Sequence, residues 1–376
     1  MKEYRLNMLS RADMVKGQGV LSAYEEELRL ISGRLDRIHG DSGDFKLNIS
    51  INDKIDGDIT HIHTVNPEFF LRLPAIKSKG IAVGSVHFLP ETVDQSLHRL
   101  HLPSVARQAF YSYLISFYKS MDRLVTVNPC FIPKLAAYGI DPQKISFIPN
   151  YVSGSVFSTV DRQQVKELRS SWGLDPERFT VVCAGQLQTR KGVLEFAQIA
   201  KALPQMQFVW AGDFAFGGMS DGHKELEKLL HDHSDNLHFT GLIERAKMPQ
   251  FYQLGDVMLL PSYDELFPMT VLEAMSCGKP ILLRDLSLYQ VILDGYYLKA
   301  ADNRQFIAQL MQLSRDEAYY ARACAMSAQG NRFYSEQHVL GMWQEFYHLC
   351  LQESLQRQSE RRRRSPVVQL AGGGWR

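Results

Sequence analysis

Two carboxylates separated by seven residues, Glu265 and Glu273, lie in the segment of the chain best suited to chemistry. The apolar run 256–260 is typical of a buried parallel strand, and Pro268 with the spacing of 270–276 predicts a helix soon after it. Amides in the first turn of a helix have no intrahelical partner and can bind a diphosphate. Two flanking hydrogen-bond acceptors would suit the hydroxyls of a nucleotide sugar. Taken singly, each acid could equally be a solvated charge or a group that stabilises the helix dipole.

A basic turn supplies a second element that could bind phosphate. The segment from Gly185 to Gly192 follows a strand-like run that ends near Cys183, precedes a helical stretch, and contains the adjacent cations Arg190 and Lys191. Its position after a strand favours phosphate binding. On spacing alone, a solvated basic turn is an equal alternative.

Two further candidates follow strands in the amino-terminal half of the chain. Gly17 and Gly19 permit close approach of the backbone to a ligand, but the third glycine of a dinucleotide fingerprint is absent, so nicotinamide binding is rejected. His87 ends the strand-like run 81–88 and would point toward a ligand at that edge. Lone histidines are more often structural.

Composition and length predict a two-domain cytoplasmic protein. The 376 residues exceed the usual size of one core, and a formal charge of +1 gives no general case for nucleic-acid binding. Five widely spaced cysteines without metal-ligand spacing indicate reduced thiols. No stretch has the length of a signal peptide core or of a membrane span.

Strand-like runs alternate with helical ones in two series. The first comprises 4–9, 59–63, 81–88, 123–127 and 144–148, and the second comprises 179–183, 207–211, 237–239, 257–260 and 280–283. Two such series predict an α/β protein with two doubly wound, Rossmann-like domains facing a central cleft. We expect an N-terminal domain at 1–160, a nucleotide-sugar-binding domain at 161–335, a helix at 336–358 and a basic, disordered tail at 359–376.

Taken in order, these motifs resemble the Glu-x7-Glu motif, the Arg-Lys-Gly element and the first glycine-rich loop of retaining glycosyltransferases of family four, which have the GT-B fold. The resemblance covers nearly the whole chain and is strongest in 180–283. It implies that the last helix crosses back to the first domain. It also implies that Glu265 faces the hexose of the donor, Glu273 binds the ribose and Lys191 contacts the diphosphate. The family usually has Arg where Gln186 stands, so Arg190 becomes the candidate second cation.

The resemblance further implies a reaction by front-side attack, in which the leaving diphosphate helps to deprotonate the acceptor. The catalytic set is then Glu265, His87, Lys191 and Arg190. No cofactor or metal is expected, since the pair His61 and His63 has no visible third ligand. The remaining donor-binding set is Gly17, Gly19, Gln186, Leu242, Ile243, Phe267, Pro268, Met269, Thr270, Val271 and Glu273.

The acceptor is sought in the first domain, where the helical segment 104–122 is apolar over most of its circumference and has basic residues around it. This pattern would suit an anionic membrane surface. A helix buried in the domain is the alternative that composition favours. The segments 16–24 and 284–289 resemble the bacterial branch that adds a second hexose to glycosyl-diacylglycerol. This resemblance favours a membrane-binding helix over a helix buried in the domain. The proposed membrane set is Arg107, Phe110, Tyr111, Tyr113, Leu114, Phe117, Tyr118 and Lys119.

We therefore predict a hexosyltransferase on the inner face of the cell membrane that moves galactose or glucose from a UDP-sugar to a glycolipid. One alternative is a transferase that acts on a soluble or polyprenyl-linked glycan of the cell surface. Others are a nucleotide-sugar epimerase and a non-catalytic binder of sugar nucleotides. The sequence does not distinguish galactose from glucose, and it does not indicate the linkage or the oligomeric state.

Overall fold

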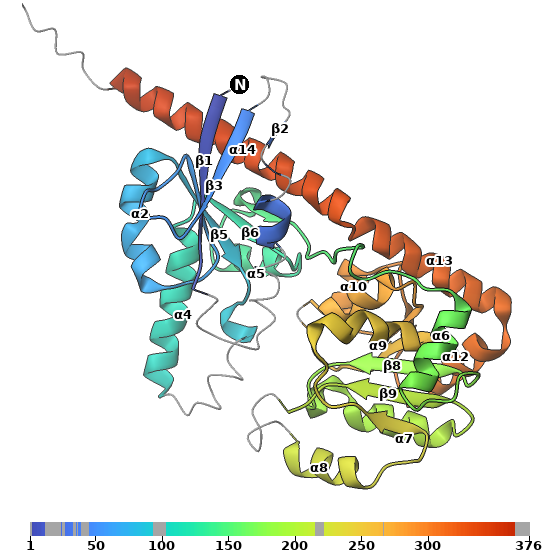
Figure 1. Ribbon diagram of the computed structural model, residues 1–376. Helices are drawn as coiled ribbons and strands as arrows, with labels where there is room; N and C mark the ends of the chain where they lie inside the picture. Colours follow the sequence, from blue (N-terminus) through green and yellow to red (C-terminus); the bar gives the residue numbers. More distant parts are fainter. Residues whose placement is uncertain are drawn as a thin grey trace, which may run out of the picture. The chain divides into compact units, whose positions relative to one another are not determined.

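The computed structural model describes residues 2–11, 24, 27–32, 35, 37–38, 45–92, 103–214, 222–265 and 267–364. The chain forms two compact units (Figure 1). The first contains residues 1–127, 131–148 and 340–376, and the second contains 128–130 and 149–339. Each unit has its own sheet and core, which confirms the prediction of two α/β domains.

Within the described residues, the first unit has a seven-stranded sheet in the order β2-β3-β1-β4-β5-β6-β7. The pairing of β2 with β3 is antiparallel, and the other strand pairs are parallel. The strands are β1 (Lys2–Leu9), β2 (Arg37–Ile38), β3 (Phe45–Ile51), β4 (Ile59–Ile62), β5 (Ile81–Val86), β6 (Arg123–Thr126) and β7 (Ile145–Phe147). The helices are α2 (Pro67–Lys79), α4 (Ser104–Lys119), α5 (Phe131–Ala137), the 3-10 turn η2 (Pro142–Lys144) and, from Leu340 onward, α14 (Glu336–Arg364).

The sheet of the second unit is wholly parallel and has the order β10-β9-β8-β11-β12-β13. Its strands are β8 (Thr180–Ala184), β9 (Gln207–Ala211), β10 (Leu237–Phe239), β11 (Val257–Leu260), β12 (Ile281–Arg284) and β13 (Leu298–Ala300). Its helices are α6 (Arg162–Ser171), α7 (Val193–Ala202), α8 (His223–His231), α9 (Met248–Leu254), α10 (Met269–Ser276), α11 (Ser287–Ile292), α12 (Asn303–Arg315) and α13 (Glu317–Phe333), with 3-10 turns η3 (Thr189–Lys191) and η5 (Arg245–Lys247).

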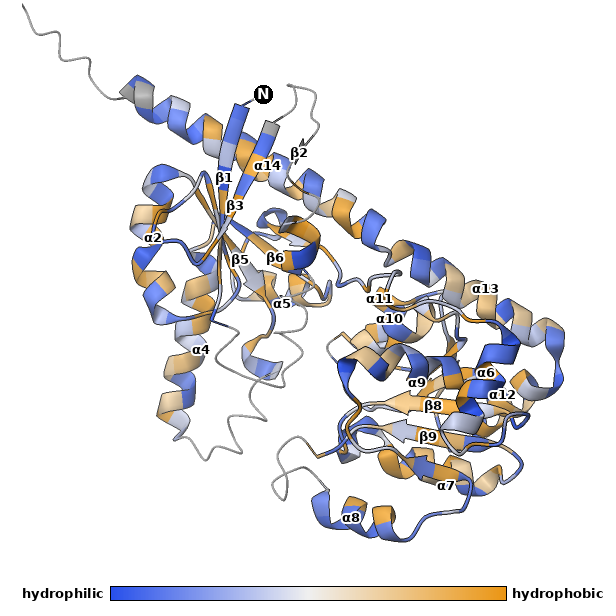
Figure 2. Ribbon diagram, in the orientation of Figure 1, coloured by the Kyte–Doolittle hydropathy of each residue, from blue (hydrophilic) through white to orange (hydrophobic). Residues whose placement is uncertain are grey.

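The burial of the strands explains why their sequences are apolar without alternation. Every residue of β8, β9 and β11 is buried, because helices cover both faces of a parallel sheet. In Figure 2, β8 has apolar colours, whereas α6 on the outside is largely hydrophilic. This layered core holds the strand ends, and so the loops that follow them, in fixed positions.

The junction between the units lies earlier than expected. The sequence predicted a boundary at residue 160, whereas the second unit begins at Pro149. Phe157 is buried in the core of the second unit, and its carbonyl accepts a hydrogen bond from Ser276 Oγ at 2.7 Å. Apolar packing therefore assigns the polar link 149–160 to the second unit.

The carboxyl-terminal helix packs on the first unit, as expected, and extends beyond the predicted end at residue 358. Tyr347 and Ser354 hydrogen-bond to His61 and to the Asp58 carbonyl of the first unit. The helix continues to Arg364, and Arg361 donates to the carbonyls of Ser78 and Lys77. The start of the predicted basic tail is thus helical, and the tail beyond residue 364 lies outside the described residues.

Candidate active site

The order of strands in the second unit reverses between β8 and β11, which pair directly. In an open α/β sheet, ligands bind at the carboxyl ends of strands where the order reverses, since the following loops diverge there. The basic turn follows β8, and the loop that carries Glu265 follows β11. The topology therefore brings together two elements that the sequence predicted separately.

Lys191 and Glu265 form an ion pair at this position. Lys191 Nζ lies 2.6 Å from Glu265 Oε1, and the two side chains are only 15% and 6% exposed. The loops are also joined through the backbone, because the Arg190 carbonyl accepts from the Tyr263 amide at 2.8 Å and from Ser262 Oγ at 3.1 Å. A cation and an acid are thus held where a ligand of the sheet would bind.

A chain of hydrogen bonds places Arg190 beside Lys191. Arg190 Nε donates to Gln188 Oε1 at 2.8 Å, and Gln188 Nε2 donates to Gln186 Oε1 at 2.9 Å. Arg190 also donates to the carbonyl of Asp264 at 3.2 Å. Gln186 therefore takes part in ordering the guanidinium, which supports Arg190 as the second cation of this loop.

Gly192 allows the two loops to pack together. Its φ is +74°, and a Cβ at this position would lie 2.4 Å from the carbonyl oxygen of Pro261. Both the left-handed backbone and the close approach require glycine. Gly173 has nearly the same φ, +73°, but a Cβ there would meet nothing within 4 Å.

We expect Gly192→Ala to lower the free energy of unfolding by about 2–4 kcal/mol, combining left-handed strain with a clash against fixed backbone. Gly173→Ala should lower the free energy of unfolding by only about 1 kcal/mol, because it adds left-handed backbone strain without a clash. Urea unfolding of both variants measures the difference. Equal losses in the two would contradict a packing role for Gly192.

Pro268 precedes α10, which begins at Met269, so the amides of Met269 and Thr270 lie in its first turn. The sequence analysis also placed Val271 in the donor-binding set, with its amide expected to be free in this first turn. That expectation is wrong, because Val271 N donates to the Pro268 carbonyl at 3.1 Å. Phe267 packs edge-on against Tyr334, with ring centroids 5.7 Å apart. At most two of these three amides are therefore available from this turn.

Glu273 is 2% exposed and is bound by two side chains that the sequence analysis missed. Tyr252 donates its hydroxyl to Glu273 Oε2 at 2.7 Å, and Arg245 pairs with Oε1. Burial, followed by the nearby Glu273 carboxylate, raises the pKa of Tyr252 well above its ordinary value. Arg245 lies over the ring of Phe157, 5.1 Å from its centroid. Arg245 lies two residues after the predicted donor residue Ile243, but this spacing does not identify Glu273 as its target.

The predicted donor-binding residues Leu242 and Ile243 follow β10 at the same edge of the sheet. The amide of Gly212, after β9, donates to the Gly241 carbonyl at 2.9 Å, which joins the two loops. Leu242 is 84% exposed, and Ile243 is half-buried against the core. Gly17 and Gly19 lie outside the described residues.

His87 follows β5 in the first unit and is partly buried. Its ring centroid lies 6.5 Å from that of His63, and its Nε2 has no hydrogen-bond partner among the described residues. Burial lowers the pKa of His87 to about 4, although the nearby His63 backbone opposes the shift. The imidazole is therefore neutral at pH 7 and presents an unpaired nitrogen.

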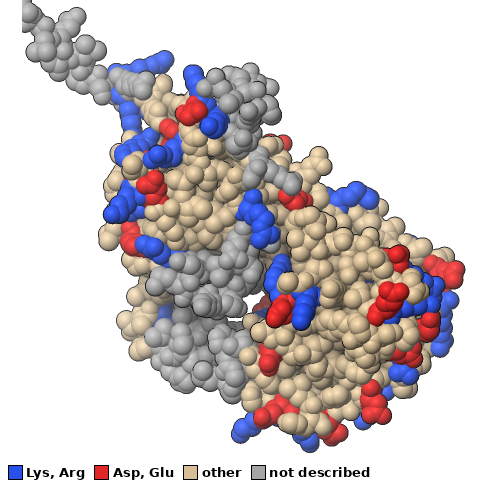
Figure 3. Space-filling model, in the orientation of Figure 1, with Lys and Arg blue, Asp and Glu red and all other residues tan. Residues whose placement is uncertain are grey.

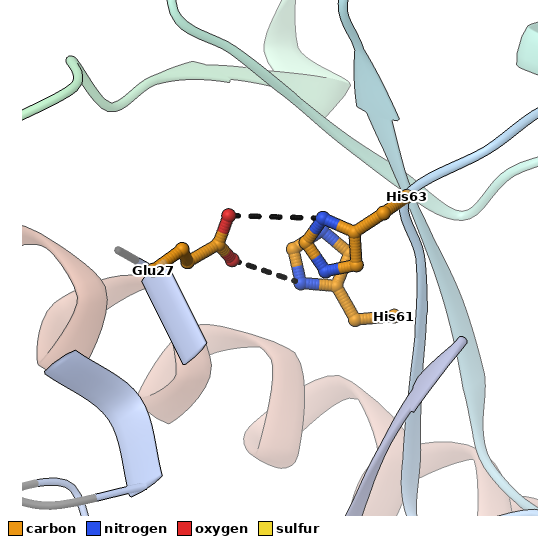
Figure 4. Close-up of side chains that lie close together, drawn as sticks. All are labelled: Glu27, His61 and His63. Carbon is orange, nitrogen blue, oxygen red and sulfur yellow. Dashed lines mark ion pairs between the residues drawn. The ribbon is translucent and has the colours of Figure 1, made fainter. Parts of the chain in front are cut away.

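Glu27 points toward the rings of His61 and His63 (Figure 4). Its oxygens lie 3.8 Å from His61 Nδ1 and 3.7 Å from His63 Nδ1. The sequence analysis had found no third group near this pair. By residue type, the three could hold a divalent cation, with donor atoms within 4.8 Å of one another. A shared zinc would require separations below roughly 4.2 Å, and both ring nitrogens of His61 are hydrogen-bonded. The geometry favours a hydrogen-bonded cluster.

The buried histidines predict that the first unit loses stability in acid. Burial lowers the pKa of His61 from 6.5 to about 3, and that of His87 to about 4. Between pH 6.5 and pH 4, the unfolded chain binds protons that the folded chain does not. The free energy of unfolding therefore decreases as the pH is lowered through this range. Burial raises the pKa of Glu27, so above pH 4.5 the folded chain holds a proton that the unfolded chain has lost. This carboxyl group therefore makes the folded state more stable as the pH is lowered toward 4.5. We expect amide exchange in β4 and β5 to accelerate at least ~10-fold between pH 7 and pH 5.5, after correction for intrinsic rates. Unchanged protection would contradict this prediction.

The predicted membrane helix lies partly in the core. Leu114, Phe117 and Tyr118 of α4 are at most 1% exposed, so they cannot contact a bilayer and are withdrawn from the membrane set. Apolar packing accounts for their spacing, as the alternative interpretation held. The remaining members are half-buried or exposed: Arg107, Phe110, Tyr111, Tyr113 and Lys119.

The amino-acid sequence of this chain is similar to those of known proteins. Residues 178–316 match the model of a family described as glycosyl transferases group 1. The alpha-galactosylglucosyldiacylglycerol synthase of Streptococcus pneumoniae is 40% identical over 92% of this chain and 90% of its own length. The processive diacylglycerol alpha-glucosyltransferase of Acholeplasma laidlawii is 23% identical over 52% of this chain and 59% of its own.

Solved structures show the same fold at low identity. Anabaena HepE, crystallised with UDP and glucose, superposes with a TM-score of 0.68 at 15% identity, covering 92% of this chain and 99% of that one. The sucrose-phosphate synthase of Thermosynechococcus elongatus gives 0.68 at 14% identity, covering 92% and 98%. Both neighbours support the assignment of the fold alone.

Proposed function

This chain belongs to the group 1 glycosyl transferases, and we propose that it moves galactose or glucose from a UDP-sugar to a glycosyl-diacylglycerol, with retention of configuration. The product would be a diglycosyl-diacylglycerol. Support for the acceptor comes from the 40% identical relative, whose name is that of such a synthase. Support for the donor comes from the neighbour that holds UDP and glucose.

The contact between Lys191 and Glu265 is the observation that carries the proposed chemistry. Placed at the reversal of strand order, it offers a cation for the diphosphate and an acceptor for sugar hydroxyls. Local cations are needed, because Figure 3 shows acidic and basic side chains interspersed on the visible face of the second unit. Such a surface has no large positive region that would attract phosphate by itself.

In the proposed reaction, the bond between the sugar C1 and the diphosphate oxygen breaks as the acceptor oxygen bonds to C1 on the same face. The acceptor proton passes to the departing phosphate oxygen. Lys191, Arg190 and the amides of Met269 and Thr270 stabilise the charge that develops there. Glu265 orients the hexose, and His87 is the proposed contribution of the first unit to sugar binding. None of these steps requires a metal.

Glu273 is proposed to bind the ribose of UDP together with its partners Arg245 and Tyr252. We expect Glu273→Gln to raise the KM for the donor by about 10–100-fold with kcat changed less than about 3-fold, since ribose contacts are the same in ground and transition states. Steady-state kinetics and UDP titration calorimetry measure this. Glu225→Gln, on the exposed surface of α8, is the control. An unchanged KM and UDP affinity would contradict ribose binding.

Membrane binding at the inner face of the cell membrane is proposed for the outward side of α4. Among the described residues, no helix is long and apolar enough to cross a bilayer, so attachment would be peripheral. Val105 is 78% exposed and Lys119 is exposed, whereas Tyr111 is half-buried and Phe110 packs against the core of the first unit. Apolar and basic groups together suit anionic lipid.

Flotation with anionic vesicles tests the surface. Val105→Ser with Tyr111→Ser should reduce the bound fraction several-fold, whereas Val291→Ser, at an exposed apolar residue of the second unit, should not. Equal vesicle binding by both variants would reject the proposal that α4 contacts the membrane.

Product analysis tests the function as a whole. Labelled UDP-galactose or UDP-glucose is supplied with glucosyl-diacylglycerol vesicles, and mass spectrometry and NMR identify the product and its linkage. We expect a diglycosyl lipid with an α linkage. Transfer only to a polyprenyl-linked or soluble glycan would overturn the lipid acceptor, and a changed donor without transfer would indicate an epimerase.

A further inference from the structure

A buried arginine, Arg284, packs against the loop that carries Glu265. Arg284 is the last residue of β12 and is only 8% exposed. The last residues that pair between the parallel strands β11 and β12 are Leu260 and Leu283. Arg284 therefore lies beside Pro261, at the point where the strand ladder ends and the loop begins.

The side chain of Arg284 attaches this loop to the sheet beyond the end of the ladder. Its Nε donates to the Pro261 carbonyl at 3.0 Å, and its Nη1 donates to the Ala301 carbonyl, just after β13, at 3.1 Å. Its Cζ lies 3.9 Å from the ring centroid of Tyr263. Because proline has no N–H, the carbonyl is the only backbone group through which Pro261 can be hydrogen-bonded. The guanidinium thus holds the first residue of the loop and stacks on the third.

The same loop is also attached to the basic turn. Tyr263 donates its amide to the Arg190 carbonyl at 2.8 Å and its hydroxyl to Glu195 Oε1 at 2.7 Å. Glu265 follows two residues later, where it meets Lys191. The position of the Glu265 carboxylate therefore depends on a loop that both the basic turn and Arg284 hold in place.

A role in filling space does not account for an arginine at this position. In the described part of the chain Arg284 forms no ion pair with an acid, and its buried Nη2 has no hydrogen-bond partner. A buried charge without a counter-ion and a buried donor without an acceptor are both unfavourable, so an apolar side chain would fill the space better. Arginine adds a planar group that can bond two carbonyls and stack on an aromatic ring at once. These properties suit the ordering of a loop.

We propose that Arg284 is a positioning residue that orders the loop 261–265, so that Glu265 presents its carboxylate to the hexose of the donor. The role of Glu265 rests on the function proposed above. UDP has no hexose, and its ribose is assigned to Glu273 on α10. Loss of Arg284 should therefore impair transfer of the sugar far more than binding of UDP.

Hydrogen exchange tests the ordering of the loop without a substrate. Arg284→Lys keeps the positive charge but has no planar group to stack on Tyr263. We expect exchange of the Tyr263 amide, followed by NMR, to accelerate at least ~10-fold. The Met258 amide, which donates to the Pro280 carbonyl at 3.0 Å in the same sheet, should stay protected. Equal acceleration of both amides, or of neither, would overturn the proposal.

Kinetics test whether Arg284 acts through Glu265. With labelled UDP-galactose or UDP-glucose and glucosyl-diacylglycerol vesicles, kcat of Arg284→Lys should fall about 10–100-fold, the effect of a small misplacement of an orienting group. The affinity for UDP, measured by calorimetry, should change less than about 3-fold. The double variant Arg284→Lys with Glu265→Gln should keep kcat within about 3-fold of Glu265→Gln alone, because the same orientation cannot be lost twice. Losses that multiply in the double variant would overturn the proposal.

Arg169→Lys is the matched control. Arg169 is 4% exposed in the same unit and also donates to a backbone carbonyl, that of Leu254 at 2.8 Å. Its acidic partner Asp256 precedes β11, at the end of the strand opposite to the Glu265 loop. This change should lower stability without lowering kcat or selectively exposing the Tyr263 amide. Equal kinetic effects of the two arginine variants would reject a specific role for Arg284.

Tyr263→Leu provides a second test if Arg284→Lys does not fold. Tyr263 is 51% exposed, so its replacement leaves the core intact while the guanidinium loses the ring on which it stacks. Tyr263→Phe keeps the ring, and kcat should fall in the leucine variant only. Equal kcat values for the two variants would count against the proposal. Absence of glycolipid transfer by the unaltered protein would reject the proposed function, and hydrogen exchange would still decide whether Arg284 orders the loop.

Discussion

Replacing Lys191 by methionine is expected to lower kcat by about 10²–10³-fold, the typical effect of removing one preorganised donor from a developing negative charge. Lys191 is held at the reversal of strand order by its contact with Glu265 and is largely shielded from water. Its interaction with the leaving diphosphate strengthens as the bond to the sugar breaks, so kcat should suffer more than the KM for the donor. Single-turnover transfer with labelled UDP-sugar measures the chemical step.

The same change should also destabilise the second unit. Glu265 is 6% exposed, and without Lys191 its carboxylate would be buried without its cation. Breaking a buried pair by removing one partner costs about 3 kcal/mol. Lys201→Met, which alters an exposed lysine of α7, is the control and should leave stability and rate unchanged. Full activity of Lys191→Met would reject the role of Lys191 in charge stabilisation.

Much of this architecture could be predicted from the sequence because parallel strands are distinctive. Apart from Gln207, the runs 207–211 and 257–260 are apolar, and the structure places buried strands at the same residues. The regular alternation of such strands with helices leaves few possible topologies, and these place Lys191 and Glu265 at one edge. The strand β3 (Phe45–Ile51) was missed, although its strict alternation of apolar and polar residues is typical of a half-buried strand.

Contacts between distant segments could not be predicted. Glu27 meets His61 and His63 only because the sheet brings β4 beneath the helical segment that follows the glycine-rich loop. The partners of Glu273 come from η5 and α9, and nothing in their spacing identifies a carboxylate as their target. For α4, an apolar circumference describes a core helix and a membrane helix equally well, and burial alone decided among its residues.

Replacing Glu265 by glutamine should lower kcat by about 10²-fold or more while the protein stays folded, because the amide fills the same volume but neither orients the hexose as a charged acceptor nor holds Lys191. Lys191 is the more exposed partner, so its unpaired charge can reach water, and this variant should lose less stability than Lys191→Met. Transfer assays and thermal unfolding give the two quantities. Full transfer by a folded Glu265→Gln protein would refute its role.

The double variant Lys191→Met with Glu265→Gln separates stability from catalysis. Removing both charges leaves neither partner buried without its counter-ion, so the free energy of unfolding should return to within about 1 kcal/mol of the original. Activity should stay at the level of the poorer single variant, because residues that act on one transition state are not additive. Recovery of both stability and transfer would show that the pair has a structural role only. Recovery of stability alone would assign both groups to the reaction.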